Sequence, residues 1–143
     1  MVIRGAIEKD FGIISSMIKE EYMKHYSERW TKANAIKTLE YFSGVGKIFV
    51  IEIDGRVLGV VIVREEYYNN RKSLMVEELV VRGDVQGKGI GRKLMEFVEG
   101  DCRENGIKFI WLITGRKARA FEFYKRIGYK LGEDTVYFSK ELG

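Results

Sequence analysis

The sequence has no proline, one cysteine and one histidine among its 143 residues. A lone cysteine excludes an intramolecular disulfide and a cysteine-rich zinc site, and it fits a reducing compartment. No apolar run is long enough to span a bilayer, and no charged-then-apolar leader is present at the N-terminus. These absences predict a cytoplasmic protein without a membrane partner.

An excess of charge of one sign is also missing, since 25 Lys and Arg face 21 Asp and Glu for a net charge of +4. This balance permits an anionic ligand, but the sequence has no basic stripe of the kind that binds nucleic acid. The composition is that of a globular protein, and the length suffices to bury a core. Without a repeat, a low-complexity tract or a Pro/Ser-rich linker, we expect a single domain over residues 1–143.

Hydrophobic periodicity predicts an α/β fold, in which helices pack on a mixed sheet. The elements follow in the order β-α-α-β-β-β-α-β-α-β-β. Asp54-Gly55 is the clearest local signal, because Asp-Gly favours the two-residue turn of a hairpin. Asp10 and Thr31 are the expected N-caps of the first two helices. The expected strands are 2–7, the two arms of a hairpin within 47–65, 74–81, 108–114, 129–131 and 136–142, with a polar turn at 67–73, helices after residues 10, 31 and 89, and a last helix over 117–128.

The segment "DVQGKGIGRK" places three glycines and three basic residues directly before an amphipathic helix. It lacks the hydroxyl that a Walker P-loop needs after the lysine, and its G-x-G-x-G spacing is not that of a Rossmann fingerprint. Two interpretations stay open. The segment is either a glycine-rich turn that caps the helix or an anion site in which backbone N–H groups and the helix dipole hold a pyrophosphate.

A wider comparison of motifs favours the anion site. The stretch "LVVRGDVQGKGIGRKLMEFVEG" resembles the acetyl-CoA-binding motif of the GNAT superfamily of N-acetyltransferases, through Leu79, Val81, Gln86, Gly89 and Gly91. Downstream, "NGIKFIWLIT" is similar to the next strand of that family, and "AFEFYKRIGYK" is similar to its Ala-x-x-Phe-Tyr-x-x-x-Gly-Phe/Tyr signature. The three blocks have the expected separation, so the resemblance covers nearly the whole chain.

The resemblance implies a mostly antiparallel central sheet that splays between its fourth and fifth strands and is flanked by about four helices. It also implies an N-acetyltransferase that uses acetyl-CoA and no metal, with direct attack by a small-molecule or protein amine in a ternary complex. Lys117 stands where many members have an asparagine that touches the cofactor. The implied cofactor-binding residues are Leu79, Val80, Val81, Gln86, Gly87, Lys88, Gly89, Ile90, Gly91, Arg92, Lys117 and Tyr124.

Acetyl transfer to an amine needs a proton for the leaving thiolate and a base for the amine. Tyr124, at the signature position, is the candidate acid, because a phenol is protonated at neutral pH. Glu77 and Glu78 are the candidate bases, and only one of them can face the active side of a regular strand. Glu77 has the parity of Leu79 and Val81, whereas a β-bulge would select Glu78. Either carboxylate is otherwise a solvated side chain.

The segment "YMKHYSERW" lies between the first two predicted helices, in the region that lines the acceptor pocket in this family. Its His25 is either a surface residue at a helix end or a group that meets the substrate. Tyr22, Tyr26 and Trp30 either form an aromatic wall around a cationic amine or pack over the edge of the sheet.

Two other functions remain open from the sequence. One is a non-catalytic module that binds acyl-CoA and has a regulatory role, and the other is a nucleic-acid-binding protein, which the charge pattern disfavours. We expect Cys102 to be a core residue, because nothing in its surroundings predicts an exposed thiol with a lowered pKa. The predicted last strands and the aromatic residues leave a homodimer open.

Overall fold

A five-stranded sheet is the centre of the first of two compact units in the computed structural model, which describes residues 1–143. The first unit is Met1–Ile113 and the second is Thr114–Gly143. The strands lie in the order β1-β2-β3-β4-β5, with antiparallel neighbours except for the parallel pair β4 and β5. The strands are β1 (Val2–Gly5), β2 (Lys47–Ile53), β3 (Arg56–Tyr68), β4 (Arg71–Val81) and β5 (Ile110–Leu112), and the helices of this unit are α1 (Phe11–Tyr26), α2 (Lys32–Val45) and α3 (Ile90–Glu104).

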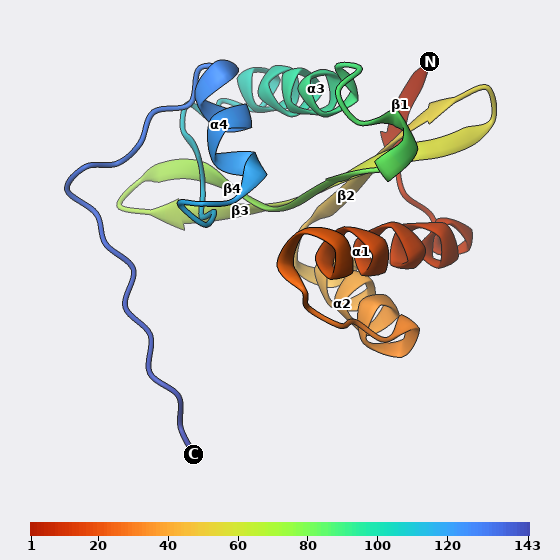
Figure 1. The fold of residues 1–143 in the computed structure, drawn as a ribbon. Helices are drawn as coiled ribbons and strands as arrows, with labels where there is room; N and C mark the ends of the chain where they lie inside the picture. Colours follow the sequence, from red (N-terminus) through yellow and green to blue (C-terminus); the bar gives the residue numbers. More distant parts are fainter. The chain divides into compact units, whose positions relative to one another are not determined.

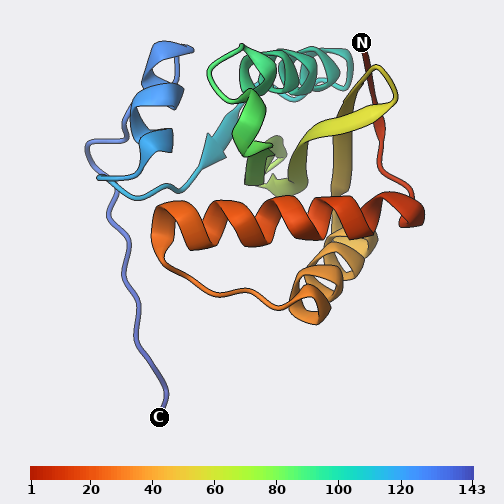
Figure 2. The same cartoon turned by 45° about the vertical axis from the view of Figure 1, so that its right-hand side comes forward.

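The helices form a layer on each side of the sheet. Helices α1 and α2 cover one face, and α3 covers the other (Figures 1 and 2). Because side chains alternate along a strand, Val60 and Ile62 of β3 point to the α1 and α2 face, where they join a buried apolar cluster with Ile14, Ile18 and Leu39. On the α3 face, Gly59 of β3 lies against Leu94 and Ile90 of α3. The sheet therefore has a packed core on both faces. No helix is both long enough and apolar enough to cross a lipid bilayer.

Two tight turns fix the register of the three long strands. Asp54 and Gly55 both have positive φ, 52° and 74°, and join β2 to β3 as the hairpin prediction requires. Asn69 and Asn70 also have positive φ, 50° and 58°, and join β3 to β4. The predicted polar turn at 67–73 is therefore too long. The strands continue up to the two asparagines because asparagine tolerates the left-handed conformation that this short turn needs.

Both predicted N-cap positions are confirmed, but only one of the two side chains caps its helix. The hydroxyl of Thr31 accepts the backbone N–H of Asn34 at 3.0 Å, which caps α2, and α3 ends before Asn105-Gly106. Asp10 does not cap α1 with its side chain. Its carboxylate accepts the N–H of Ile7 at 2.8 Å and pairs with Arg4 at 2.8 Å, so it stabilises the turn at Glu8–Asp10 before the helix.

Strands β4 and β5 pair over only three residues. Leu74 to Val76 of β4 lie beside Ile110 to Leu112 of β5, and β5 ends there. On its other edge, β4 stays paired with β3 as far as Val81, which lies opposite Gly59. The predicted splay between the fourth and fifth strands is confirmed, although β5 is shorter than the expected 108–114 and is only partly buried.

The second unit contains one helix, α4 (Arg119–Arg126), which is shorter than the predicted 117–128. The strands predicted at 129–131 and 136–142 are wrong, because neither segment has strand structure. A β-strand needs a neighbouring strand to receive its N–H and C=O groups, and high β-propensity alone does not supply one. The apolar side chains that suggested the last strand are exposed: Val136, Tyr137, Phe138 and Leu142.

Two glycines near the end of α2 allow a matched test of the packing of this helix end against β3. A Cβ added at Gly46 would lie 2.3 Å from the carbonyl oxygen of Val63, whereas one added at Gly44, inside the helix, would meet nothing within 4 Å. We expect Gly46→Ala to lower the free energy of unfolding by about 1–3 kcal/mol, because backbone must move. Gly44→Ala should raise it by about 0.5–1 kcal/mol through helix propensity. Urea unfolding of both variants checks the pair, and equal effects would contradict the close approach of α2 to β3.

Candidate functional site

The open edge of β4 is the first part of the candidate site. Beyond Val76 the side of β4 that faced β5 has no strand beside it, so the edge from Glu77 to Val81 can receive an extended ligand in the manner of an added strand. The predicted residues Leu79, Val80 and Val81 lie on this edge. Val80 is anchored in the core below α1 and α2, which holds the strand in place.

The glycine segment follows directly and leads into α3. Gly87 and Gly89 have φ of 79° and 82°, and a Cβ at either would meet nothing within 4 Å. Gly89 is the N-cap of α3 and no side chain caps the helix, so the backbone N–H groups of the first turn, which begins at Ile90, stay available for an anion. Lys88 and Arg92 are exposed beside them, as is Lys93. This arrangement can hold a pyrophosphate.

Gln86, at the start of the glycine segment, connects the end of β4 to α1. Its side-chain amide donates to the carbonyl oxygen of Val81 at 2.9 Å and to both carboxylate oxygens of Glu21 at 3.3 Å. Glu21 also lies 3.6 Å from Nε2 of His25, one turn later on α1. Glu21 is not among the residues predicted from the sequence, since nothing local in the sequence connects residues that are 65 positions apart.

A β-bulge gives the two candidate bases different surroundings. Ile62 of β3 lies opposite Glu78, but the next residue, Val63, lies opposite Val76, so Glu77 has no partner in the register. The Glu77 carboxylate contacts Arg64 at 3.0 Å. Glu78 keeps the face of Ile62, toward α1. The β-bulge that would favour Glu78 over Glu77 as the candidate base is therefore present.

Glu78 lies in an environment that disfavours its charge. Burial is the largest cause, and the negative charges of Glu28, Glu77 and Glu21 add to it, so the pKa of Glu78 rises from its ordinary value of 4.5 to about 7. The hydroxyl of Tyr22 donates a hydrogen bond to its Oε1 atom, which opposes this rise. A carboxyl with this pKa exchanges protons near neutral pH, as a general base must.

The predicted acceptor residues gather at the end of α1. The ring of Tyr22 lies 5.2 Å from that of Tyr26 and 5.0 Å from that of Trp30, measured between centroids. Tyr22 and Trp30 also pack against the core below the sheet. The structure thus brings the three aromatic residues together, and His25 lies beside Glu21 on the same helix.

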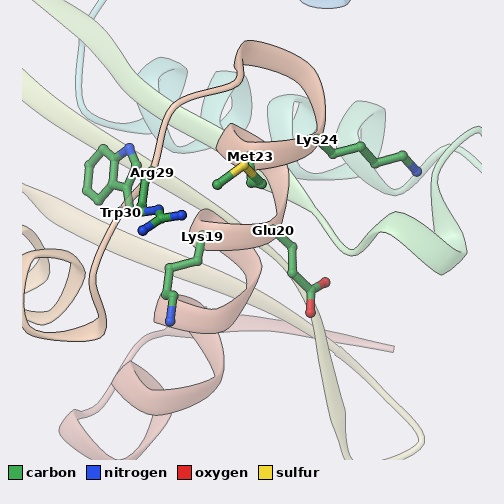
Figure 3. Close-up of a pocket in the computed structure, with 6 residues that line it drawn as sticks. All are labelled: Lys19, Glu20, Met23, Lys24, Arg29 and Trp30. Carbon is green, nitrogen blue, oxygen red and sulfur yellow. The ribbon is translucent and has the colours of Figure 1, made fainter.

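Trp30 also lines a pocket. The five further lining residues are Lys19, Glu20, Met23, Lys24 and Arg29, which come from α1 and from the segment that follows it (Figure 3). The Nε1 atom of Trp30 is buried and has no hydrogen-bond partner. Of the four predicted acceptor residues, Trp30 alone lines this pocket.

The remaining predicted residues belong to the second unit or to the core. Tyr124 lies on α4, where its ring makes edge contacts with Phe123 at 5.1 Å and Tyr129 at 5.6 Å. Lys117 precedes α4 and is exposed. Cys102 is 2% exposed on α3, and burial raises the pKa of its thiol to about 11, which removes it as a nucleophile.

Comparisons with known proteins agree with this arrangement. A model of the acetyltransferase (GNAT) family matches residues 15–129. Streptothricin acetyltransferase from Streptomyces lavendulae is 36% identical over 87 residues, which are 59% of this chain and 45% of that protein. Aminoalkylphosphonate N-acetyltransferase from Salmonella typhimurium is 31% identical over 92 residues, which are 62% of this chain and 58% of that protein. The chain thus spans about half the length of the curated relatives it matches.

Solved structures show the same fold at low identity. A crystal structure of a possible acetyltransferase from Clostridium difficile 630 has a TM-score of 0.88 at 16% identity and covers 99% of this chain and 98% of that one. Ribosomal-protein-alanine N-acetyltransferase from Brucella melitensis biovar Abortus 2308 has a TM-score of 0.81 at 18% identity, with 99% of both chains covered.

The raised pKa of Glu78 makes stability depend on pH. The folded protein holds this proton more tightly than the unfolded chain, so wild-type stability falls as pH rises from 4.5 to about 7. Glu78→Gln has no such proton. Between about pH 5 and about pH 8 we expect its free energy of unfolding to rise by on the order of 2 kcal/mol relative to that of wild type. Thermal or urea unfolding at both pH values measures the difference.

Glu77→Gln is the matched control, because it removes the neighbouring carboxylate, which pairs with Arg64. This variant keeps the Glu78 carboxyl, so its stability should still fall as pH rises, as that of wild type does. A Glu78→Gln variant whose difference from wild type is the same at both pH values would contradict the buried environment of Glu78.

Proposed function

The chain belongs to the GNAT family of acetyltransferases, and on this basis we propose that it moves an acetyl group from acetyl-CoA to a primary amine by direct attack in a ternary complex. The observation that carries the proposal is a continuous ligand path. The open edge of β4 leads into the segment 86–89, which ends at the uncapped first turn of α3.

The residues along this path fit the donor. The edge from Leu79 to Val81 offers backbone groups to an amide-containing arm such as pantetheine. Gly87 and Gly89 leave open space where a side chain would otherwise stand, and the α3 amides with Lys88 and Arg92 supply positive charge for a pyrophosphate. Bound there, acetyl-CoA supplies the activated acetyl group as a thioester.

Glu78 is the proposed general base. A free alkylamine has a pKa of about 10, so it arrives protonated and must lose a proton before it attacks. Transfer to an ordinary carboxylate is uphill by about six pKa units, whereas transfer to Glu78, with a pKa of about 7, is uphill by about three. The proton moves to the carboxylate directly or through one water.

Tyr124 is the proposed general acid. Its phenol would donate a proton to the sulfur as the thioester bond breaks, which returns the leaving group as a neutral thiol. Support for this role comes from the match of Ala120, Phe123, Tyr124, Gly128 and Tyr129 to the signature of the family. The exposed Lys117, in place of the usual asparagine, is a candidate for a contact with a cofactor phosphate.

The acceptor is proposed as a small-molecule or protein amine that enters along α1, beside Tyr22, Tyr26 and Trp30. The names of the proteins reported above refer to streptothricin, an aminoalkylphosphonate and a ribosomal-protein alanine, so they do not agree on one acceptor. Aromatic rings next to carboxylates suit a cationic amine, because both attract positive charge.

Two glycines test the donor site. Gly89 and Gly106 have similar left-handed φ values of 82° and 72° and open space around them, but Gly89 begins α3 and Gly106 follows its end. Alanine at either position carries the same backbone strain. We expect Gly89→Ala to weaken acetyl-CoA binding at least about tenfold, or about 1.4 kcal/mol, and Gly106→Ala to leave it unchanged. Calorimetry and the ligand-induced rise in Tm measure this. Wild type that ignores acetyl-CoA would contradict the proposal.

Catalysis is tested with a panel of amines and two variants. Tyr124→Phe and Glu78→Gln should each lower kcat by about 10²–10⁴-fold with acetyl-CoA affinity retained. Wild-type kcat/KM should rise with pH through an apparent pKa of about 7, as Glu78 ionises. Tyr137→Phe is the control, because this phenol is 74% exposed in the same unit as Tyr124. Acetyl-CoA binding without transfer to any amine would instead favour a non-catalytic acyl-CoA-binding module.

A further inference from the structure

We propose that Tyr22 is a positioning residue that orients the carboxylate of Glu78 from across the core, rather than part of the wall that contacts the acceptor. The proposal rests on the assignment of Glu78 as the base of the proposed function. It gives Tyr22 a role other than the two that the sequence leaves open, which are an aromatic wall around a cationic amine and packing over the edge of the sheet.

The geometry of the pair is specific. Tyr22 on α1 and Glu78 on β4 are 56 positions apart in the sequence, and the phenol donates to Oε1 of the carboxylate. Glu78 receives no other hydrogen bond, so its second oxygen stays free for the proton of the amine. A carboxylate with one oxygen held and one free accepts a proton from a defined direction, whereas a freely rotating side chain does not.

The phenol ring is itself held in place. The rings of Tyr26 and Trp30 lie 5.2 Å and 5.0 Å away, and the ring packs against the core cluster under the sheet. A ring confined in this way loses little further freedom when its hydroxyl makes a hydrogen bond. The phenol therefore sets the orientation of the Glu78 carboxylate, and the carboxylate does not set that of the phenol.

The neighbouring residue on α1 secures the helix to the donor side. Glu21 accepts the amide of Gln86, which also bonds to Val81 at the end of β4. Consecutive residues of α1 thus hold the segment that leads to the proposed pyrophosphate site and the proposed base. The segment before the proposed pyrophosphate site and the proposed base are therefore both hydrogen-bonded to the same helix.

The charges around Glu78 explain why a donor is needed there. Glu21 on α1, Glu28 after α1 and Glu77 on β4 all oppose its ionised form, and burial opposes it further. The hydrogen bond from Tyr22 acts in the opposite direction and favours the carboxylate. Burial and the charge of Glu78 raise the pKa of Tyr22, so the phenol keeps the proton that it donates.

The test is Tyr22→Phe, which removes the hydroxyl and keeps the ring. Titration of Glu78 by NMR on protein with labelled glutamate needs no acceptor amine. We expect its midpoint to move to higher pH by on the order of one unit, because the favourable contact of the ionised form is lost. With an amine substrate, the acid limb of kcat/KM should move in the same direction, kcat should fall at least about tenfold, and acetyl-CoA affinity should stay unchanged.

Two controls separate positioning from folding. Tyr41→Phe removes a phenol that is 62% exposed on α2 and should change neither the titration nor the rate. In a Glu78→Gln background, Tyr22→Phe should cause no further loss of kcat, because a residue that acts through another loses its effect when that residue is gone.

The outcomes are distinct. A Glu78 midpoint that does not move, or a rate loss that is equal at all pH values and persists in the Glu78→Gln background, would overturn the positioning role. A shifted midpoint in a protein that binds acetyl-CoA but acetylates no amine would support the Tyr22–Glu78 contact and overturn the proposed transfer reaction.

Discussion

The site depends on one constraint, which is that β4 is paired from Arg71 to Val81 on one edge, apart from the bulge at Glu77, and over only three residues on the other. Pairing with β3 and the burial of Val80 hold the strand in place. The missing partner beyond Val76 leaves backbone groups that still need hydrogen bonds. A strand that is held firmly and left half-paired is a template for an extended ligand, and the glycine segment continues that template to the start of α3.

The β-bulge at Glu77 adds chemistry to this template. Without the extra residue, Glu77 and Glu78 would point to opposite faces in the regular order. With it, Glu77 meets Arg64, and Glu78 lies toward α1 in surroundings that disfavour its charge. The same burial that suits Glu78 to its proposed role as a base makes its ionised form costly for folding, which is the usual conflict between stability and activity at a functional site.

Helix α1 connects the parts that β4 separates. Its buried face packs on the sheet through Ile14 and Ile18, and its last turns carry Glu21 and Tyr22, which reach Gln86 and Glu78. The helix is therefore both a layer of the core and a brace for the site. A change in its packing would move the donor segment and the base together.

The sequence by itself determined the order of the elements in the first unit, the Asp54-Gly55 hairpin, the cap at Thr31, the glycine segment before α3 and the family. These follow from local chemistry: turn residues, capping hydroxyls, apolar periodicity and a motif of fixed spacing. It could not determine the end of the chain, where β-rich segments at 129–131 and 136–142 form no strand. Only the tertiary structure placed Glu78 on the face toward α1 and Glu77 beside Arg64. It also joined Tyr22 to Glu78 and Glu21 to Gln86, because a bulge and contacts across more than 50 positions depend on how strands and helices pack.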